Sequence, residues 1–150
     1  MEKIRSFTGK NRFLSNFYAA PVTIDGITYP NNESAFQAQK CKTTEEKMEF
    51  AAITNPSVAK RKGKKVSGLD VTLWNFARTR IMKEVCLAKF TQNPDLKEKL
   101  LSTGDAELEE GNGWNDTFWG VSNKTGNGKN HLGKILMEVR EELSKEERGQ

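Results

Sequence analysis

Histidine and cysteine are scarce in this sequence, and their scarcity argues against several kinds of site. His131 is the single histidine among 150 residues, which argues against a histidine-rich metal centre and against a Ser-His-Asp triad. The two cysteines, Cys41 and Cys86, lie far apart in predicted helical stretches. This placement is typical of reduced thiols in a cytoplasmic protein rather than of a disulfide framework or a zinc site. We therefore expect chemistry based on carboxylates, lysines, amides and aromatic rings.

Long apolar runs are also absent. No segment approaches the ~18–20 apolar residues of a membrane span, and the chain does not open with a signal-peptide pattern. We therefore expect no membrane partner. With 35% hydrophobic and 29% charged residues, the composition is that of an ordinary soluble globular protein. The length of 150 residues predicts a single domain, residues 1–150, that can bury a sizeable core.

The net charge of +4 is unevenly distributed along the chain. Basic residues concentrate in the run Lys60–Lys65, and Lys124, Lys129 and Lys134 add a second basic stretch. Such a run is either a solvated loop or a surface that attracts an anionic substrate or a nucleic acid. The sequence leaves both interpretations open.

The stretch from Tyr29 to Lys40 organises the rest of the chain. Pro30 ends an extended run, because the residue before a proline is kept out of helical geometry, and Asn31 or Asn32 can then cap a helix. On that helix, one face carries a carboxylate, an aromatic ring, an amide and an amine, supplied by Glu33, Phe36, Gln37 and Lys40. This face is either the floor of a polar pocket or a solvated surface with a Glu–Lys pair.

The remaining pattern predicts an α+β fold, mostly helical with a small β-sheet. Asp25-Gly26 is a two-residue hairpin turn that pairs Val22 with Tyr29 and Ile24 with Ile27. A short buried strand is expected over residues 116–121, preceded by a turn at residues 111–113. Helices are expected over residues 44–53, from residue 57 to the basic run, from residue 70 or 72 to 91, over 95–101 and over 130–145.

Three further features indicate ligand contacts. Arg78 lies on the apolar stripe of the predicted long helix, where it either pairs with an acid or reaches an anionic ligand. Trp114 and Trp119 lie in an acidic segment that contains several glycines. They either fill the core or stack on a flat ring of a ligand. The loop 124–130, which contains Lys129 and Asn130, feeds a helix N-terminus that could bind phosphate, although it lacks the P-loop pattern.

Several of these segments together resemble the NADAR family, also called the YbiA-like or DUF1768 family. The matching segments cover almost the whole chain: Phe13-Leu14-Ser15-Asn16-Phe17, Tyr29-Pro30, Glu33-Ser34-Ala35-Phe36-Gln37 with Lys40, Thr103 to Leu108, Trp114 with Asp116 to Gly120, and Leu132 to Arg140. The usual Glu-His of the family is Glu33-Ser34 here, and Leu73 stands where an acidic residue often precedes the long-helix tryptophan. We therefore assign no role to position 34.

The resemblance implies a mostly helical α+β fold of the NADAR/YbiA type and an N-glycosidase that needs no metal and no cofactor. Such an enzyme cleaves the C1–N bond of a phosphorylated ribosyl substrate. The substrate is either ADP-ribose on guanine in nucleic acid or a riboflavin-pathway ribosylaminopyrimidine phosphate. By the same resemblance, the predicted catalytic residues are Glu33, Lys40 and Asp116. The predicted substrate-binding residues are Arg12, Ser15, Asn16, Phe17, Trp74, Arg78, Trp114, Trp119, Lys129 and Asn130.

The chemistry of these residues suits the implied reaction. Cleavage of a ribosyl C1–N bond develops oxocarbenium character at C1, which a carboxylate stabilises. Glu33 or Asp116 can do this or activate water, whereas Lys40 can hold a phosphate or attack C1. Two other classes use the same features without catalysis: a module that binds ADP-ribose or a nucleic-acid end, and a nucleic-acid-binding module built on Lys60–Lys65. The sequence also leaves the oligomeric state open.

Overall fold

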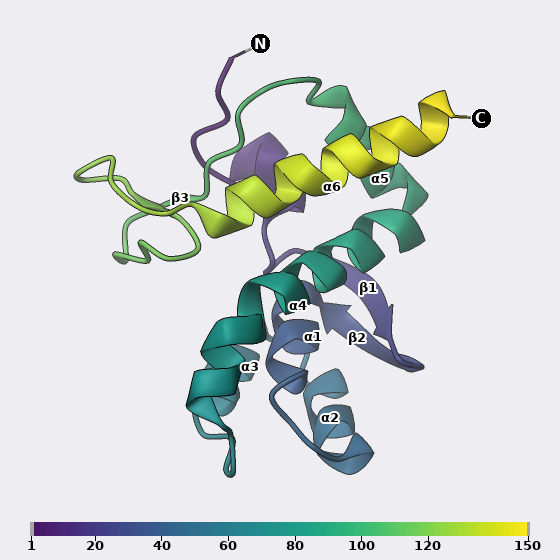
Figure 1. Ribbon diagram of the computed structural model, residues 1–150, viewed down its shortest axis with the longest axis vertical. Helices are drawn as coiled ribbons and strands as arrows, with labels where there is room; N and C mark the ends of the chain where they lie inside the picture. Colours follow the sequence, from purple (N-terminus) through teal and green to yellow (C-terminus); the bar gives the residue numbers. More distant parts are fainter. Residues whose placement is uncertain (1, 150) are drawn as a thin grey trace. The chain divides into compact units, whose positions relative to one another are not determined.

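The structure is a computed structural model that describes residues 2–149. It divides into two compact units, one formed by Asn16–Asn93 and the other by Met1–Ser15 with Pro94–Gln150. Helices dominate both, and each contains a two-stranded sheet (Figure 1). The predicted α+β, mostly helical class is therefore confirmed. Within residues 2–149 no helix is both long and apolar enough to cross a membrane.

The unit formed by Asn16–Asn93 begins with the predicted hairpin. Strand β1, Ala19–Ile24, pairs antiparallel with β2, Ile27–Asn31, in the predicted register of Val22 with Tyr29 and Ile24 with Ile27. Asp25 and Gly26 both have positive φ, at 49° and 83°, as the tightest hairpin turns require. Val22 and Tyr29 are buried on one face, so the hairpin covers the core of this unit.

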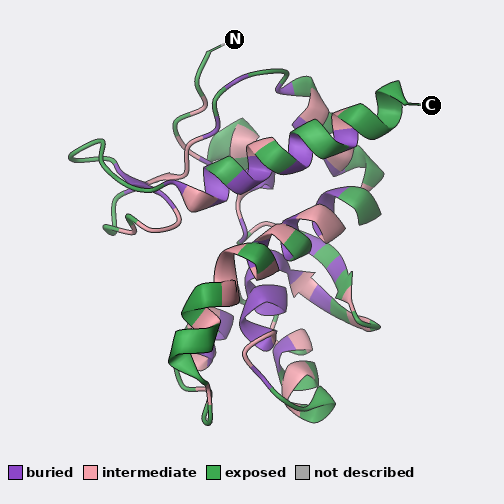
Figure 2. Ribbon diagram, in the orientation of Figure 1, coloured by how far each residue is buried: buried purple, intermediate pink, exposed green. Residues whose placement is uncertain are grey.

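Helix α1, Asn32–Ala38, follows the hairpin directly and is capped by Asn31, whose side chain accepts the N–H of Ser34. Every residue of α1 is buried, including four polar ones (Figure 2). Ala35 and Ala38 are completely buried, which lets neighbouring elements approach the helix closely. The helix contacts both strands of the hairpin and the three other helices of its unit, so it lies at the centre of this unit.

Those three helices each have a side-chain cap at the N-terminus. Helix α2, Thr44–Ala51, is capped by Thr43, whose hydroxyl accepts the N–H of Glu46 and donates to the carboxylate of the same residue. Helix α3, Pro56–Gly63, is capped by Asn55 and ends in the basic run, whose first residues are therefore helical rather than in a loop. Helix α4, Val71–Gln92, is capped by Asp70, as predicted.

The other unit is less regular between its helices. It contains the 3₁₀ helix η1, Gly9–Leu14, helix α5, Pro94–Ser102, and helix α6, His131–Arg148, and α5 packs on α6. The predicted apolar stripe of α6 is buried, and it consists of Leu132, Ile135, Leu136, Val139 and Leu143. Two predictions were wrong: Gly111–Asn112 is strand β3 rather than a turn, and its parallel partner β4 is only Val121–Ser122. Residues 116–120 form no strand: side chains bind the N–H groups of residues 116, 118 and 119, and the carbonyls of residues 117–120 accept the N–H groups of residues 129–132.

Candidate functional site

Glu33 lies in the first turn of α1, where a carboxylate suits the helix dipole. Its backbone N–H donates to the carbonyl of Asn16 at 3.0 Å. The side chain is buried, and its Oε2 accepts a hydrogen bond from Nε2 of Gln37 at 2.8 Å. A buried carboxylate held by a neutral donor one turn away is typical of a group kept for chemistry.

Lys40 lies close to the same region. The sequence had predicted it on the helix with Glu33, but it lies after the helix ends. Helix α1 ends at Ala38, and the N–H of Lys40 closes a tight turn by donating to the carbonyl of Gln37. Its Nζ donates to the carbonyl of Gly63 at 3.1 Å and lies 5.5 Å from the ring centroid of Trp74. The amine is therefore held between the end of α3 and the start of α4.

Burial lowers the pKa of Lys40, and the carboxylate of Glu33 opposes this effect while Lys64 adds to it. A lysine with a lowered pKa exposes a neutral, nucleophilic amine at a lower pH than an ordinary lysine does. The Trp74 ring that flanks this amine also packs against Phe36, with the ring centroids 5.1 Å apart. Helix α1, the turn that follows it and the first half of α4 thus place Lys40 beside Trp74 and within electrostatic range of Glu33, so three of the predicted site residues lie in one region.

The other predicted residues of this unit vary in exposure. Asn16 is buried, and its side chain accepts from Asn32 and donates to the sulfur of Met82. Phe17, next to it, is 41% exposed. Arg78 is half-buried on α4, one turn after Trp74.

The predicted residues at the start of the chain belong to the other unit. Arg12 is exposed in η1, and the N–H of Ser15, which follows that helix, donates to the carbonyl of Arg12. A ligand role for both residues stays a prediction.

Asp116 organises the backbone of its own loop. Its Oδ1 accepts the N–H groups of Phe118 at 3.1 Å and Trp119 at 2.9 Å. Asn112 fixes the residue from the other side, because its amide accepts the N–H of Asp116 and donates to the carbonyl of the same residue. At least one oxygen of this carboxylate is therefore occupied by the fold.

The two tryptophans of this unit differ in environment. Trp114 is 67% exposed, whereas Trp119 is half-buried and packs on Phe118 with the ring centroids 4.8 Å apart. His131 joins the same cluster, 4.5 Å from the Phe118 ring. Trp114 is thus the tryptophan here that offers a free face for stacking.

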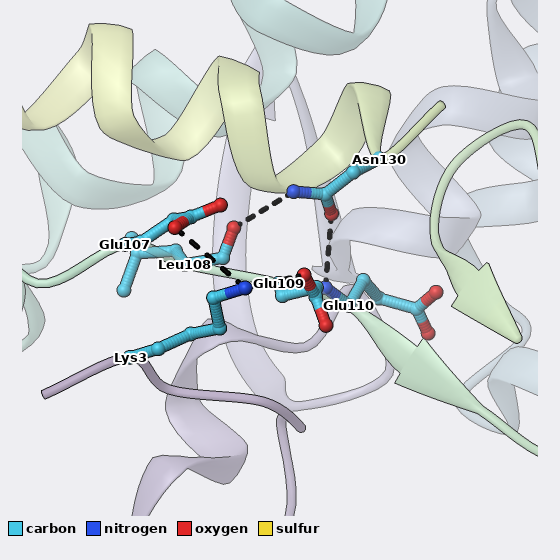
Figure 3. A network of polar contacts seen from close by, with 6 residues as sticks. All are labelled: Lys3, Glu107, Leu108, Glu109, Glu110 and Asn130. Carbon is cyan, nitrogen blue, oxygen red and sulfur yellow. Dashed lines mark hydrogen bonds and ion pairs between the residues drawn. The ribbon is translucent and has the colours of Figure 1, made fainter. Parts of the chain in front are cut away.

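The loop that leads into α6 corrects one prediction. The sequence predicted a phosphate site at the loop 124–130 and the helix N-terminus that follows it, but the amides of residues 129–132 each donate to a backbone carbonyl of residues 117–120. Asn130 is buried, and its side chain joins the carbonyl of Leu108 to the N–H of Glu110 (Figure 3). Lys129 is exposed, with Nζ 5.9 Å from the Phe118 ring centroid. Any anion binding at this loop therefore depends on lysine side chains rather than on those amides.

Comparison with known proteins explains why these segments occur together. Residues 5–144 match the NADAR domain. The chain belongs to the NADAR family. It is 39% identical over 130 residues to N-glycosidase YbiA of Escherichia coli K12, covering 87% of this chain and 80% of the relative. It is also 37% identical over 131 residues to a riboflavin biosynthesis protein of Vibrio vulnificus, covering 87% of this chain and 35% of that protein.

The fold matches as well. The NMR structure of the E. coli protein YbiA superimposes with a TM-score of 0.85 at 35% identity, covering 100% of this chain and 90% of that one. The predicted family, fold and enzyme class, an N-glycosidase, are confirmed by these relatives.

Within this NADAR domain, the structure adds residues to which the sequence gave no role. The sequence indicated that Gln37 lies on the same helix face as Glu33, one turn later, but the spacing alone does not predict the hydrogen bond between the two side chains. Gly63 and Asn112 carried no such signal, because Gly63 accepts from a lysine 23 residues earlier and Asn112 binds the backbone of an irregular loop. Ser34, which replaces the usual histidine, is completely buried and donates to the carbonyl of Phe50, so it ties α1 to α2.

Proposed function

We propose that this NADAR protein hydrolyses the C1–N bond of a phosphorylated ribosyl substrate. The two candidate substrates are ADP-ribose attached to guanine in nucleic acid and a riboflavin-pathway ribosylaminopyrimidine phosphate. The name of the Vibrio vulnificus relative supports the inclusion of the second. We also propose that residues 1–150 act as one domain, since the NADAR match runs through both units.

The observation that carries the proposal is the arrangement of Glu33, Lys40 and Trp74 around the first helix. A buried carboxylate that accepts a hydrogen bond is suited to an ionised role, either to stabilise positive charge at C1 or to activate water. A half-buried lysine with a lowered pKa is suited to nucleophilic attack. An indole ring beside that amine offers a flat surface to the departing base.

The nucleophilic route can be written with its bonds and protons. The neutral amine of Lys40 attacks C1, the C1–N bond breaks, and its electron pair leaves with the base, which takes up a proton. Loss of a proton from the new amine and opening of the ring give a Schiff base between C1 and Lys40. Water then adds to C1 and releases the free ribosyl phosphate and the amine. In the direct route, water activated by Glu33 replaces Lys40 as the nucleophile.

The test is incubation of the purified protein with each substrate class. The substrates are a single-stranded oligonucleotide with one ADP-ribosylated guanine and a ribosylaminopyrimidine phosphate, and released base or amine is measured by chromatography. We expect turnover of at least one, and its loss in Glu33→Gln. If both substrates bind but are recovered intact, the proposal fails and the protein is instead a non-catalytic binding module. Binding that falls steeply with salt and ignores Glu33→Gln would point instead to the basic run on α3.

A further inference from the structure

Gln37 binds Glu33 and lies next to Gly63, which accepts the hydrogen bond of Lys40, although the proposed reaction gives Gln37 no role. Its side chain is buried, and Nε2 donates to Oε2 of Glu33 at 2.8 Å. The other end of the same amide, Oε1, is also buried and has no hydrogen-bond partner within residues 2–149. A buried amide oxygen without a partner is costly. Such an arrangement is kept where the bond at the other end of the amide matters.

Gly63 lies directly beside that oxygen. A Cβ at this position would lie 1.9 Å from Oε1 of Gln37, so any other residue would displace the amide. The carbonyl of the same glycine accepts the hydrogen bond from Nζ of Lys40. A chain of contacts therefore runs from Glu33 through the Gln37 amide and Gly63 to the Lys40 amine.

We propose that Gln37 is a positioning residue of this site: its amide fixes the direction of the Glu33 carboxylate and keeps it ionised, and Gly63 is a glycine to leave room for that amide. The inference rests on the proposed function, because it assumes that Glu33 acts as a carboxylate. Nothing in the reaction requires Gln37 to touch the substrate.

The charges around Glu33 explain why a neutral donor suits this position. Lys40 already supplies positive charge here, because Glu33 acts electrostatically on its amine, on which Lys64 acts as well. Arg78 lies one turn after Trp74 on α4, and the Trp74 ring flanks the same amine. Elsewhere around α1, Glu46, Lys47, Glu49 and Lys62 act on Cys41, and Asp25 acts on Tyr29. An amide N–H favours the charged form of the carboxylate without adding another cation beside a developing oxocarbenium ion.

The first test compares Gln37→Met with Gln39→Met by the pH dependence of kcat/KM. Gln39 is the matched control, because its amide donates to the backbone carbonyl of Ala35 on the same helix. Loss of the Gln37 bond should move the acid limb that reports protonation of Glu33 toward higher pH by about one unit, whereas the limb that reports protonation of the Lys40 amine should stay in place. The control should leave both limbs in place. A Gln37→Met enzyme with an unmoved Glu33 limb, whether or not its rate falls at every pH, would overturn the proposal.

Gln37→Glu is the second variant, in case the methionine variant fails to fold. Two carboxyl groups at hydrogen-bond distance share a proton, so the acid limb should move further than in Gln37→Met, and the rate should recover at higher pH. A limb that stays at the parent position contradicts the proposal. A parent protein that is inactive on every substrate would instead remove the proposed function, so the two failures are distinguishable.

Gly63 provides an independent test through non-additivity. Gly63→Ala alone should reproduce the shifted acid limb, because the new Cβ displaces the amide. In a Gln37→Ala background the same change should cause no further loss of kcat/KM, since the side chain with which Cβ collides is gone. Gly113→Ala, which adds a Cβ in open space, is the matched control. Equal losses from Gly63→Ala in both backgrounds would overturn the proposed link.

Discussion

The α1 region and the loop that contains Asp116 use the same kinds of side chain for different ends. On α1 the backbone groups are bound by the helix itself, by the Asn31 cap and by the carbonyl of Asn16, and the side chains of Glu33 and Gln37 bond to each other. In the loop before α6 the backbone is irregular, and Asp116, Asn112 and Asn130 all bind backbone groups. Buried backbone groups require partners, and where no helix or sheet supplies them, short polar side chains do.

This difference changes how much weight each predicted site residue carries. Polar side chains that are buried against one another on regular elements have no structural need for that arrangement, and they favour a functional interpretation. Polar side chains that cap an irregular backbone already have a sufficient reason to be present. We therefore expect the largest effects on turnover from the α1 region and smaller ones from the loop.

Lys40→Arg should have the largest effect. Arginine keeps the positive charge and can still donate to the carbonyl of Gly63, but guanidinium is not a nucleophile near neutral pH. We expect a loss of ~10³-fold or more in kcat. Borohydride added to the parent during turnover should fix a ribosyl adduct, which peptide mapping should place on Lys40. An active Lys40→Arg enzyme and no adduct would limit Lys40 to an electrostatic role.

The pH profile of the parent sharpens the same prediction. The neutral amine is the reactive form, and burial lowers the pKa of Lys40. As pH falls below that lowered pKa the amine is protonated, so the rate of adduct formation should fall toward acid pH. It should also reach its plateau at a lower pH than an ordinary lysine would allow. A plateau reached only where free lysine side chains titrate would contradict the role of burial.

Glu33→Gln should have the next largest effect. The glutamine fills the same space but cannot carry a negative charge, so we expect a loss of ~10²-fold or more in kcat. Ligand affinity and the free energy of unfolding should change little. Isothermal titration and urea unfolding check those two quantities. Parent-like turnover by this variant would make Glu33 a structural residue.

Asp116 tests whether a polar residue that organises the loop before α6 also takes part in the reaction. Asp116→Asn keeps an oxygen that can accept the N–H groups of Phe118 and Trp119, whereas Asp116→Ala removes it. If the carboxylate acts at the reacting end, the asparagine variant loses ~10-fold in kcat with unchanged stability, and this is the outcome we expect. The alanine variant should also lose about 1 kcal/mol of stability, as for a lost helix cap. A fully active Asp116→Asn would make Asp116 a loop-organising residue alone.

The sequence predicts those features that are set by local patterns, and it misses those that are set by other contacts. The hairpin register, the caps at Asn31 and Asp70 and the stripe of α6 were predictable, because turn residues and periodicity are local signals. The end of α1 two residues before Lys40 and the irregular segment 116–120 were not. Helix α1 ends in a tight turn in which the N–H of Lys40 donates to the carbonyl of Gln37, and the Lys40 amine binds Gly63, 23 residues away. The segment 116–120 is fixed by the side chains of Asn112 and Asp116 and by N–H groups of residues 129–132, which no local pattern indicates.

Lys129→Ala should have the smallest effect and tests what is left of the predicted phosphate loop. The amides of residues 129–132 are bound to carbonyls, so those groups do not bind an anion, whereas the exposed side chain of Lys129 can attract one. A single solvent-screened charge contributes at most about 1 kcal/mol. We expect the KM for phosphorylated substrates to rise by about 3- to 5-fold with kcat unchanged. The dephosphorylated substrate should show no change in KM, and Lys134→Ala, an exposed lysine on α6, is the matched control. Equal KM values for parent and variant on both substrates would remove Lys129 from the site.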